Sequence, residues 1–273
     1  MRILAIGDIF GKTGRQIIND LLLQIKVNFQ IDIVIANVEN ATHGKSISRK
    51  HYSILKSNGV DIMTSGNHIF SLQETRKYIS ECPDLLRPLN SNPFHPGNGT
   101  FTLIYKNKKI RITNLIGTDF MPPSENPYFS LERVLEIDDS DIHIVDFHAE
   151  ATAEKIAFAW YFDGKITALY GTHTHVQTSD ERILKKGTAF ITDIGMTGPR
   201  NGIIGATPES IIERAKYGFS SKMEPNEDEG QFNGIILEFD DLNNKVVSIE
   251  RLNFFKENYK NLILEILKEK IKN

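Results

Sequence analysis

The chain has 273 residues, of which 40% are hydrophobic and 25% charged, a composition typical of a soluble globular protein. Its 32 Lys and Arg against 35 Asp and Glu give a net charge of −3, which argues against a broad surface for nucleic acid or an anionic membrane. The single cysteine, Cys82, excludes an intramolecular disulfide, and no apolar run approaches the ~20 residues of a membrane span. The length permits one domain or two; we expect a cytoplasmic protein with a single domain over residues 1–273.

Short apolar runs rich in β-branched residues predict buried strands in both halves of the chain. Helical spacing predicts a helix after a capping box at Thr13 and Gln16, and two more over residues 48–57 and 72–79. Strands that alternate with helices imply crossover connections and a largely parallel sheet. The strand runs are RILAIGD, IDIVIANVEN, VDIMTSGNH, IHIVDFHAE, ITALYGTHTH and AFITDIG.

The second half adds antiparallel elements. Two segments predict β-hairpins, with turns at residues 106–109 and 243–244. MPPSENP, MTGPRNG and the acidic KMEPNEDEGQ are predicted to be loops. The C-terminal ENYKNLILEILKEKIKN predicts an amphipathic helix that packs on the body or on a partner subunit.

The fragment GDIFGKTG near the N-terminus approximates a phosphate-binding P-loop. Its two glycines, Gly7 and Gly11, are separated by three residues where a P-loop has four. Asp8 also follows the predicted strand directly, and its carboxylate would repel phosphate unless a metal ion lay between them. The fragment therefore raises the question of whether the rest of the chain supplies metal ligands.

Ligand-type side chains follow five of the predicted strands. A lone His in such a position usually makes a structural hydrogen bond, but five strand ends of this kind are unlikely by chance, and ligands gather at the carboxyl ends of strands. Nitrogen and oxygen donors without thiolate suit Zn, Fe or Mn, and so many donors are too many for one tetrahedral ion but suit two ions that share a bridging carboxylate. In an extended segment, His173 and His175 would point to the same side. The residues are Asp8, Glu39, Asn40, Asn67, His68, His148, His173 and His175.

The motifs GDIF, VENATHG, SGNHIF, DFHAE and GTHTH, within residues 1–180, resemble those of the calcineurin-like metallophosphoesterases. Two positions differ: Phe10 stands where that family usually has His, and Val-Glu-Asn replaces Gly-Asp-x-x-Asp. These differences, with DIGMTGP at 193–199, resemble the YmdB-like subfamily over nearly the whole chain. The resemblance implies an α/β fold, a two-sheet sandwich flanked by helices in four αββα layers.

The resemblance also implies roles for these residues. One metal would be held by Asp8, Glu39, Asn40 and His175, with Asn40 compensating for Phe10. The second would be completed by Asn67, His148 and His173, with Glu39 as the bridge. His68 would be the general acid and not a ligand. Asp193, which ends another strand, is a candidate to orient a ligand His.

The implied activity is that of a phosphodiesterase with two metal ions, iron or manganese, with zinc or magnesium as alternatives. A metal-bridged hydroxide would attack 2',3'-cyclic nucleotides or related ribonucleotide phosphodiesters. Two alternatives are a regulatory or RNA-decay interaction protein with a slow or vestigial site, and an amidase or other two-metal hydrolase. The expected partner is a small cyclic nucleotide or an RNA end; neither a membrane nor a broad nucleic-acid surface is expected, and homo-oligomerisation is left open.

Overall fold

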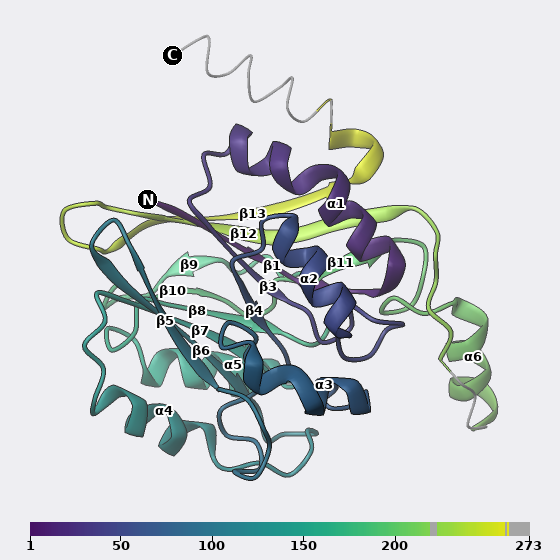
Figure 1. Ribbon diagram of the computed structural model, residues 1–273, viewed down its shortest axis with the longest axis horizontal. Helices are drawn as coiled ribbons and strands as arrows, with labels where there is room; N and C mark the ends of the chain where they lie inside the picture. Colours follow the sequence, from purple (N-terminus) through teal and green to yellow (C-terminus); the bar gives the residue numbers. More distant parts are fainter. Residues whose placement is uncertain (219–222, 260, 262–273) are drawn as a thin grey trace.

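The computed structural model describes residues 1–218, 223–259 and 261, and shows two mixed sheets packed face to face (Figure 1). In the described residues the first sheet has seven strands, in the order β2-β11-β12-β1-β3-β4, with β13 paired to β12. β1, β3 and β4 are parallel, whereas β12 is antiparallel to β1, β11 and β13. The strands are β1 (Arg2–Ile6), β2 (Asp8–Ile9), β3 (Ile33–Asn37), β4 (Ile62–Thr64), β11 (Met196–Pro199), β12 (Gly230–Phe239) and β13 (Val246–Phe255).

The second sheet has six strands in the part of the chain that the structure describes, in the order β5-β6-β7-β8-β10-β9. Its four inner strands are parallel, and an antiparallel strand lies at each edge. The strands are β5 (Thr100–Tyr105), β6 (Lys108–Ile116), β7 (Ile142–His148), β8 (Ala168–Thr172), β9 (Arg182–Ile183) and β10 (Ala189–Ile191).

Helices cover the outer faces of the sandwich, so the predicted four-layer αββα order is confirmed (Figure 1). Helices α1 and α2 pack on the first sheet, and α4 and α5 pack on the second. The helices are α1 (Gly11–Asn28), α2 (Arg49–Ser57), α3 (Gln73–Tyr78), α4 (Pro127–Leu135), α5 (Thr152–Tyr161) and α6 (Pro208–Tyr217), with 3₁₀ turns η1 (Ile79–Glu81) and η2 (Lys256–Asn258).

The strands alternate between two apolar environments because successive side chains point to opposite faces of a sheet. In β1, Ile3 packs between the sheets, whereas Leu4 packs beneath the α1 layer. In β7, Ile144 packs between the sheets, whereas Phe147 packs beneath α5. Burial on both faces explains why these strands read as continuous apolar runs.

The six predicted strand runs and both predicted hairpins are confirmed, and three predictions need correction. The sheets are mixed because the hairpin strands and β12 add antiparallel pairs. Helix α1 begins at Gly11, two residues before the predicted cap at Thr13. The N–H of Gly11 donates to the Asn40 carbonyl, and no side chain caps the helix. MTGPRNG is not all loop, because β11 pairs with β2 and β12.

Two remaining expectations concern the ends and the membrane. The predicted C-terminal helix falls mainly on residues 260 and 262–273, which lie outside the described residues. Among the described helices, none is both long and apolar enough to cross a membrane.

Candidate metal centre

The eight predicted site residues meet at one end of the sandwich. In the first sheet, Asp8 follows β1, Glu39 follows β3 and Asn67 follows β4. In the second sheet, His148 is the last residue of β7 and His173 follows β8. Parallel strands place their carboxyl ends at one edge, so both sheets contribute ligand-type side chains to the same place.

One cluster of donor atoms converges on His148, which is fully buried. Its Nε2 lies 3.1 Å from Glu39 Oε1, 3.1 Å from Asn67 Oδ1 and 3.0 Å from His173 Nδ1. Glu39, His148 and His173 also satisfy a general distance criterion for a metal-binding group. Two imidazoles, a carboxylate and an amide oxygen form a donor set that suits a first-row transition metal.

A second cluster lies around Asp8, on the other side of the centre. His175 Nε2 lies 3.3 Å from Asn40 Oδ1 and 3.8 Å from Asp8 Oδ1. Asp8 is fully buried and its Oδ1 has no hydrogen-bond partner. A buried carboxylate oxygen without a donor is costly unless a cation binds it, so the cluster fits a second ion.

Each of the three histidines uses its other ring nitrogen to contact an acceptor outside the clusters. His148 Nδ1 lies 2.9 Å from Thr172 Oγ1, and His173 Nε2 lies 3.0 Å from Glu150. His175 Nδ1 lies 2.8 Å from the carbonyl of Ile204. Histidine ligands of metals typically make such outer contacts, which fix the ring and its tautomer.

A buried polar chain extends behind His148. The Thr172 hydroxyl donates to Asp146 Oδ1 at 2.7 Å, so Thr172 Oγ1 accepts from His148 Nδ1–H. Asp146 is fully buried and also accepts from Thr64 and, at 3.3 Å, from Asn37. The proton is thereby held on Nδ1, which leaves Nε2 free to bind a cation.

The carboxylates of the centre stabilise a positive charge beside them, and a proton on His148 can supply that charge. Burial alone would lower the pKa of His148, but the carboxylates of Glu39 and Asp8 raise it to about 9. Burial would raise the pKa of Glu39, yet the neighbouring His148 lowers it to about 2. Burial raises the pKa of Asp8 and lowers that of His173 to about 3. A metal ion could replace the proton on His148 and satisfy these groups together.

Gly66 lets the β4 loop approach the centre. A Cβ on Gly66 would lie 2.1 Å from His148 Nε2 and 2.5 Å from Glu39 Oε2, so a side chain there would fill the place where the donor atoms meet. The next residues, Asn67 and His68, are thus held against the centre. The His68 backbone N–H donates to Glu39 Oε2 at 3.0 Å.

The segment after β8 is not extended, contrary to the geometry predicted for His173 and His175. Their φ angles are 101° and 64°, both in the left-handed region that non-glycine residues rarely adopt. The two rings therefore reach different clusters, His173 beside His148 and His175 beside Asp8. Such strained backbone concentrates at functional sites.

Phe10 occupies the position where the metallophosphoesterase motif has His. Its ring is buried and meets the His175 ring edge-on, with centroids 5.7 Å apart. It offers no ligand atom, while Asn40 Oδ1 supplies an oxygen beside His175.

The fragment GDIFGKTG does not form a phosphate loop. Gly11 opens α1, and Lys12 pairs at 2.8 Å with Glu227, so its ammonium group already has a carboxylate partner. Asp8 instead points its carboxylate at the histidines.

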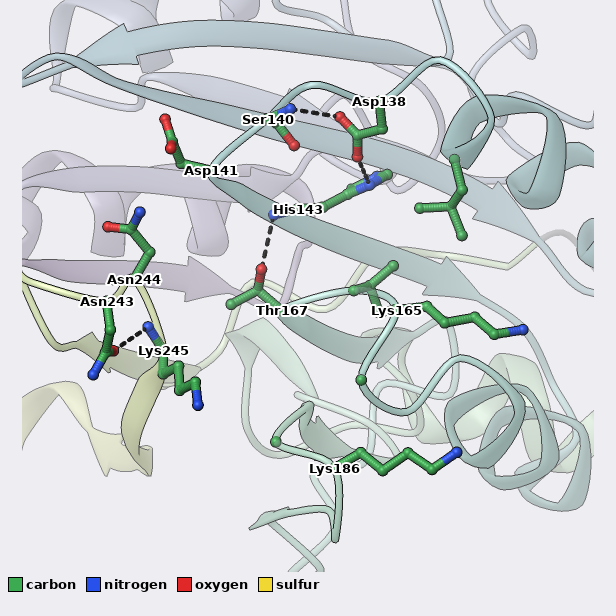
Figure 2. A pocket seen from close by; sticks show the side chains of 14 residues that line it. Asp138, Ser140, Asp141, His143, Lys165, Thr167, Lys186, Asn243, Asn244 and Lys245 are labelled. Atoms are coloured by element: carbon green, nitrogen blue, oxygen red, sulfur yellow. Dashed lines mark hydrogen bonds and ion pairs between the residues drawn. The ribbon is translucent and has the colours of Figure 1, made fainter.

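A separate cavity of about 490 Å³ lies at the opposite ends of the parallel strands (Figure 2). Asp138 Oδ2 lies 2.6 Å from His143 Nδ1, and Asp138 Oδ1 accepts a hydrogen bond from the Ser140 N–H (Figure 2). His143 begins β7, whereas His148 ends it, so this cavity does not belong to the metal centre.

Two sets of supporting residues are not predicted by the strand-end pattern. Asp146 lies within a strand, and its sequence signal is a carboxylate in an otherwise apolar run, two residues before His148. Lys155 of α5 is fully buried and donates to Asp193 at 2.7 Å and to the Thr172 carbonyl at 2.9 Å. Asp193 in turn accepts from the N–H of Thr174, so it positions the segment between the histidines and not a ring.

Comparison with known proteins agrees with this architecture. A family model described as YmdB-like protein matches residues 4–252. A putative phosphatase/phosphodiesterase of Mycoplasma pneumoniae is 43% identical, covering 96% of this chain and 99% of that protein. The 2',3'-cyclic-nucleotide 2'-phosphodiesterase of Bacillus subtilis is 41% identical, covering 92% and 96%. The crystal structure of a phosphatase from Mycoplasma pneumoniae superposes with a TM-score of 0.90 at 42% identity, covering 93% of each chain.

The αββα sandwich, with histidine, carboxylate and amide side chains at its strand ends, is the fold of the metallophosphoesterases. Within that class the chain belongs to the YmdB-like family, because the family model spans most of its length.

Proposed function

We propose that this chain is a two-metal phosphodiesterase that hydrolyses ribonucleotide phosphodiesters, with 2',3'-cyclic nucleotides as its small-molecule substrates. The observation that carries the proposal is the pair of donor clusters, one at His148 Nε2 and one between Asp8 and His175, at the ends of both sheets. The names of the relatives, phosphodiesterase and phosphatase, support the same reaction class.

The donor sets assign residues to each ion. Asp8, Asn40 and His175 would hold the first ion; Asn67, His148 and His173 would hold the second; Glu39 would serve both. Two such ions, when bound, supply an activated water and neutralise phosphoryl oxygens during in-line attack. The nitrogen and oxygen donors, without thiolate, favour iron or manganese.

His68 is the proposed general acid. Its backbone is tied to Glu39 Oε2, which places the imidazole beside the centre, while its ring belongs to neither donor cluster. Burial lowers the pKa of His68, although the Glu39 carboxylate opposes this. A phosphodiester anion bound beside the ring would raise that pKa and favour the protonated form that donates to the departing oxygen.

A substrate panel tests the proposal. Protein loaded with Mn²⁺ or Fe²⁺ would be assayed on 2',3'-cyclic nucleotides, phosphomonoesters and short RNAs, with metal content measured by elemental analysis. We expect about two ions per chain and the fastest turnover on a 2',3'-cyclic nucleotide. Faster hydrolysis of monoesters than of every diester would make the protein a phosphatase instead. Bound metal with no turnover on any phosphoester would favour the interaction-protein hypothesis.

A further inference from the structure

An apolar cleft of about 240 Å³ adjoins the metal centre on the side of Asn67 and His68. Gly66 and Asn67 line it at one end, so it is continuous with the proposed catalytic site. The next two residues after His68, Ile69 and Phe70, form part of its wall. The cleft is therefore lined by residues on both sides of His68 in the chain.

The walls of this cleft suit a flat aromatic ligand. The Phe70 ring lies against the His95 ring, with centroids 4.7 Å apart and planes at 59°. Among the other lining residues, Ile116 is buried, whereas Pro122 and Pro123 are exposed. Nucleobases bind to proteins by stacking on such aromatic and apolar surfaces, with their polar edges bonded at the rim.

We propose that this cleft holds the nucleobase of the substrate ribonucleotide. The inference rests on the proposed function: when water opens a 2',3'-cyclic phosphate by breaking its P–O2' bond, the oxygen that His68 would protonate is O2', on the ribose carbon next to the one that carries the base. The base must then lie within one sugar of His68, on the side that this cleft occupies. Ser91, Asn92 and Ser124 line the cleft and offer polar groups to the edge of a base.

The test compares adenosine 2',3'-cyclic phosphate with methyl riboside 2,3-cyclic phosphate, which has the same reacting group and no base. We expect the wild-type protein to prefer the nucleotide by at least about tenfold in kcat/KM, in line with the strength of one stacked base. Phe70→Leu, which keeps apolar bulk in the partly buried wall, should lose most of this preference, as should His95→Ala. Phe129→Ala, on the exposed face of α4, is the matched control and should keep it.

Equal kcat/KM of the wild-type protein for the two probes would overturn the proposal, as would an unchanged preference in both cleft variants. Equilibrium dialysis with free adenosine tests base binding without turnover, so it distinguishes failure of the cleft proposal from failure of the proposed function. Adenosine retained by the wild-type protein and released by Phe70→Leu would support the cleft even in a protein that hydrolyses neither probe. Absence of adenosine binding together with absent turnover would overturn it.

A second observation concerns Arg87, in a cavity of about 710 Å³ that shares Ser91 and Pro123 with the cleft. Arg87 is 9% exposed and its Nε has no hydrogen-bond partner, while Nη1 donates to the carbonyls of Pro88 and Leu89. Among the described residues no ion pair is formed by Arg87; the one carboxylate that lines the cavity, Glu125, already binds Arg133. A buried guanidinium without an anion is costly, so the cavity favours an anionic ligand.

We infer that Arg87 receives the phosphate upstream of the reacting nucleotide, so that the substrate is an RNA 3' end closed by a 2',3'-cyclic phosphate. A dinucleotide with this terminus would then be preferred to the cyclic mononucleotide by about tenfold at low salt, and the preference should shrink as salt rises. Arg87→Gln, which keeps a donor for the loop carbonyls, should abolish the preference. Arg214→Gln, an exposed arginine on α6, should retain it. Equal kcat/KM of the wild-type protein for the two substrates would contradict this assignment.

Discussion

Glu39 is the residue whose two carboxylate oxygens have separate partners: Oε1 faces His148 and Oε2 accepts from His68. Because it would serve both ions, Glu39→Ala should remove both and abolish turnover. Asp8→Ala should abolish turnover but leave the ion held around His148. Elemental analysis and activity assays of the two variants check this difference, with Glu209→Ala on the exposed face of α6 as the control. Two ions retained in Glu39→Ala would contradict the bridging role.

His68, unlike its neighbour Asn67, is proposed to act in catalysis without binding a metal ion. General acid catalysis typically contributes about 10²–10⁴-fold, so His68→Ala should lower kcat by about that factor with metal content unchanged. The loss should be smaller for a p-nitrophenyl diester, whose leaving group needs little protonation. Steady-state kinetics on both substrates measure it; an equal loss on good and poor leaving groups would give His68 another role.

The site residues could be proposed from the sequence because each follows a strand-like run, and parallel strands bring such positions together. Two residues that support them, Asp146 and Lys155, could not be proposed in this way. Asp146 lies inside β7, and Lys155 lies inside α5, where an apolar pattern gives no reason to expect a paired charge. The division of the histidines between two clusters also depends on the left-handed backbone at His173 and His175, which no spacing rule predicts.

At the scale of elements, α5 holds the segment after β8 through one buried ion pair, Lys155 with Asp193. Lys155→Met would leave the carboxylate buried and uncompensated, which typically costs about 3–5 kcal/mol. It would also release the Thr172 carbonyl, just before His173. We expect a lower free energy of unfolding and reduced metal content. Chemical denaturation and elemental analysis measure both; Lys165→Met, whose ammonium lies over the Tyr161 ring, is the control.

An unchanged free energy of unfolding in Lys155→Met would show that the ion pair is dispensable. Loss of stability with full metal retention would show that α5 supports the sheet but not the histidine segment.

The six strand runs and both hairpins were predictable because apolar runs and turn residues are local signals, whereas the short strands β2, β9 and β11 were not predicted. Helices α4, α5 and α6 were missed, although α4 and α6 carry a local signal: Asn126-Pro127 and Thr207-Pro208 place an N-cap residue before Pro in the first turn. The pairing of β12 with β1 and β11 was not predictable, because it joins segments separated by some 30 to more than 200 residues.

At the scale of the whole molecule, the proposed ligands are divided between the two sheets: Asp8, Glu39, Asn40 and Asn67 come from the first, and the three histidines from the second. Ions bound there would link the sheets and stabilise the folded state by mass action. Chelation should therefore lower the Tm of the wild-type protein, and added Mn²⁺ should restore it. Calorimetry with and without chelator measures this, and Glu39→Ala should show little response. If neither the chelator nor added Mn²⁺ changes the Tm of the wild-type protein, the sheets are not linked by bound metal.

The single domain expected from the sequence predicts one cooperative unfolding transition, seen alike by far-ultraviolet circular dichroism and by Trp160 fluorescence. Two separate unfolding transitions would contradict the single domain.

The position of β12 has a consequence for synthesis on the ribosome. The first strand, β1, finds its antiparallel partner only in Gly230–Phe239, and the backbone N–H groups of Gly7 and Asp8 donate to the carbonyls of Asn233 and Gly195. A nascent chain can therefore display β1, β3 and β4 long before Asp8 is fixed in place, with the free edge of β1 exposed to neighbouring chains. Binding of the proposed ions would have to wait until nearly the entire polypeptide has emerged, so an interrupted translation product would be a chain prone to aggregate and not a partial enzyme.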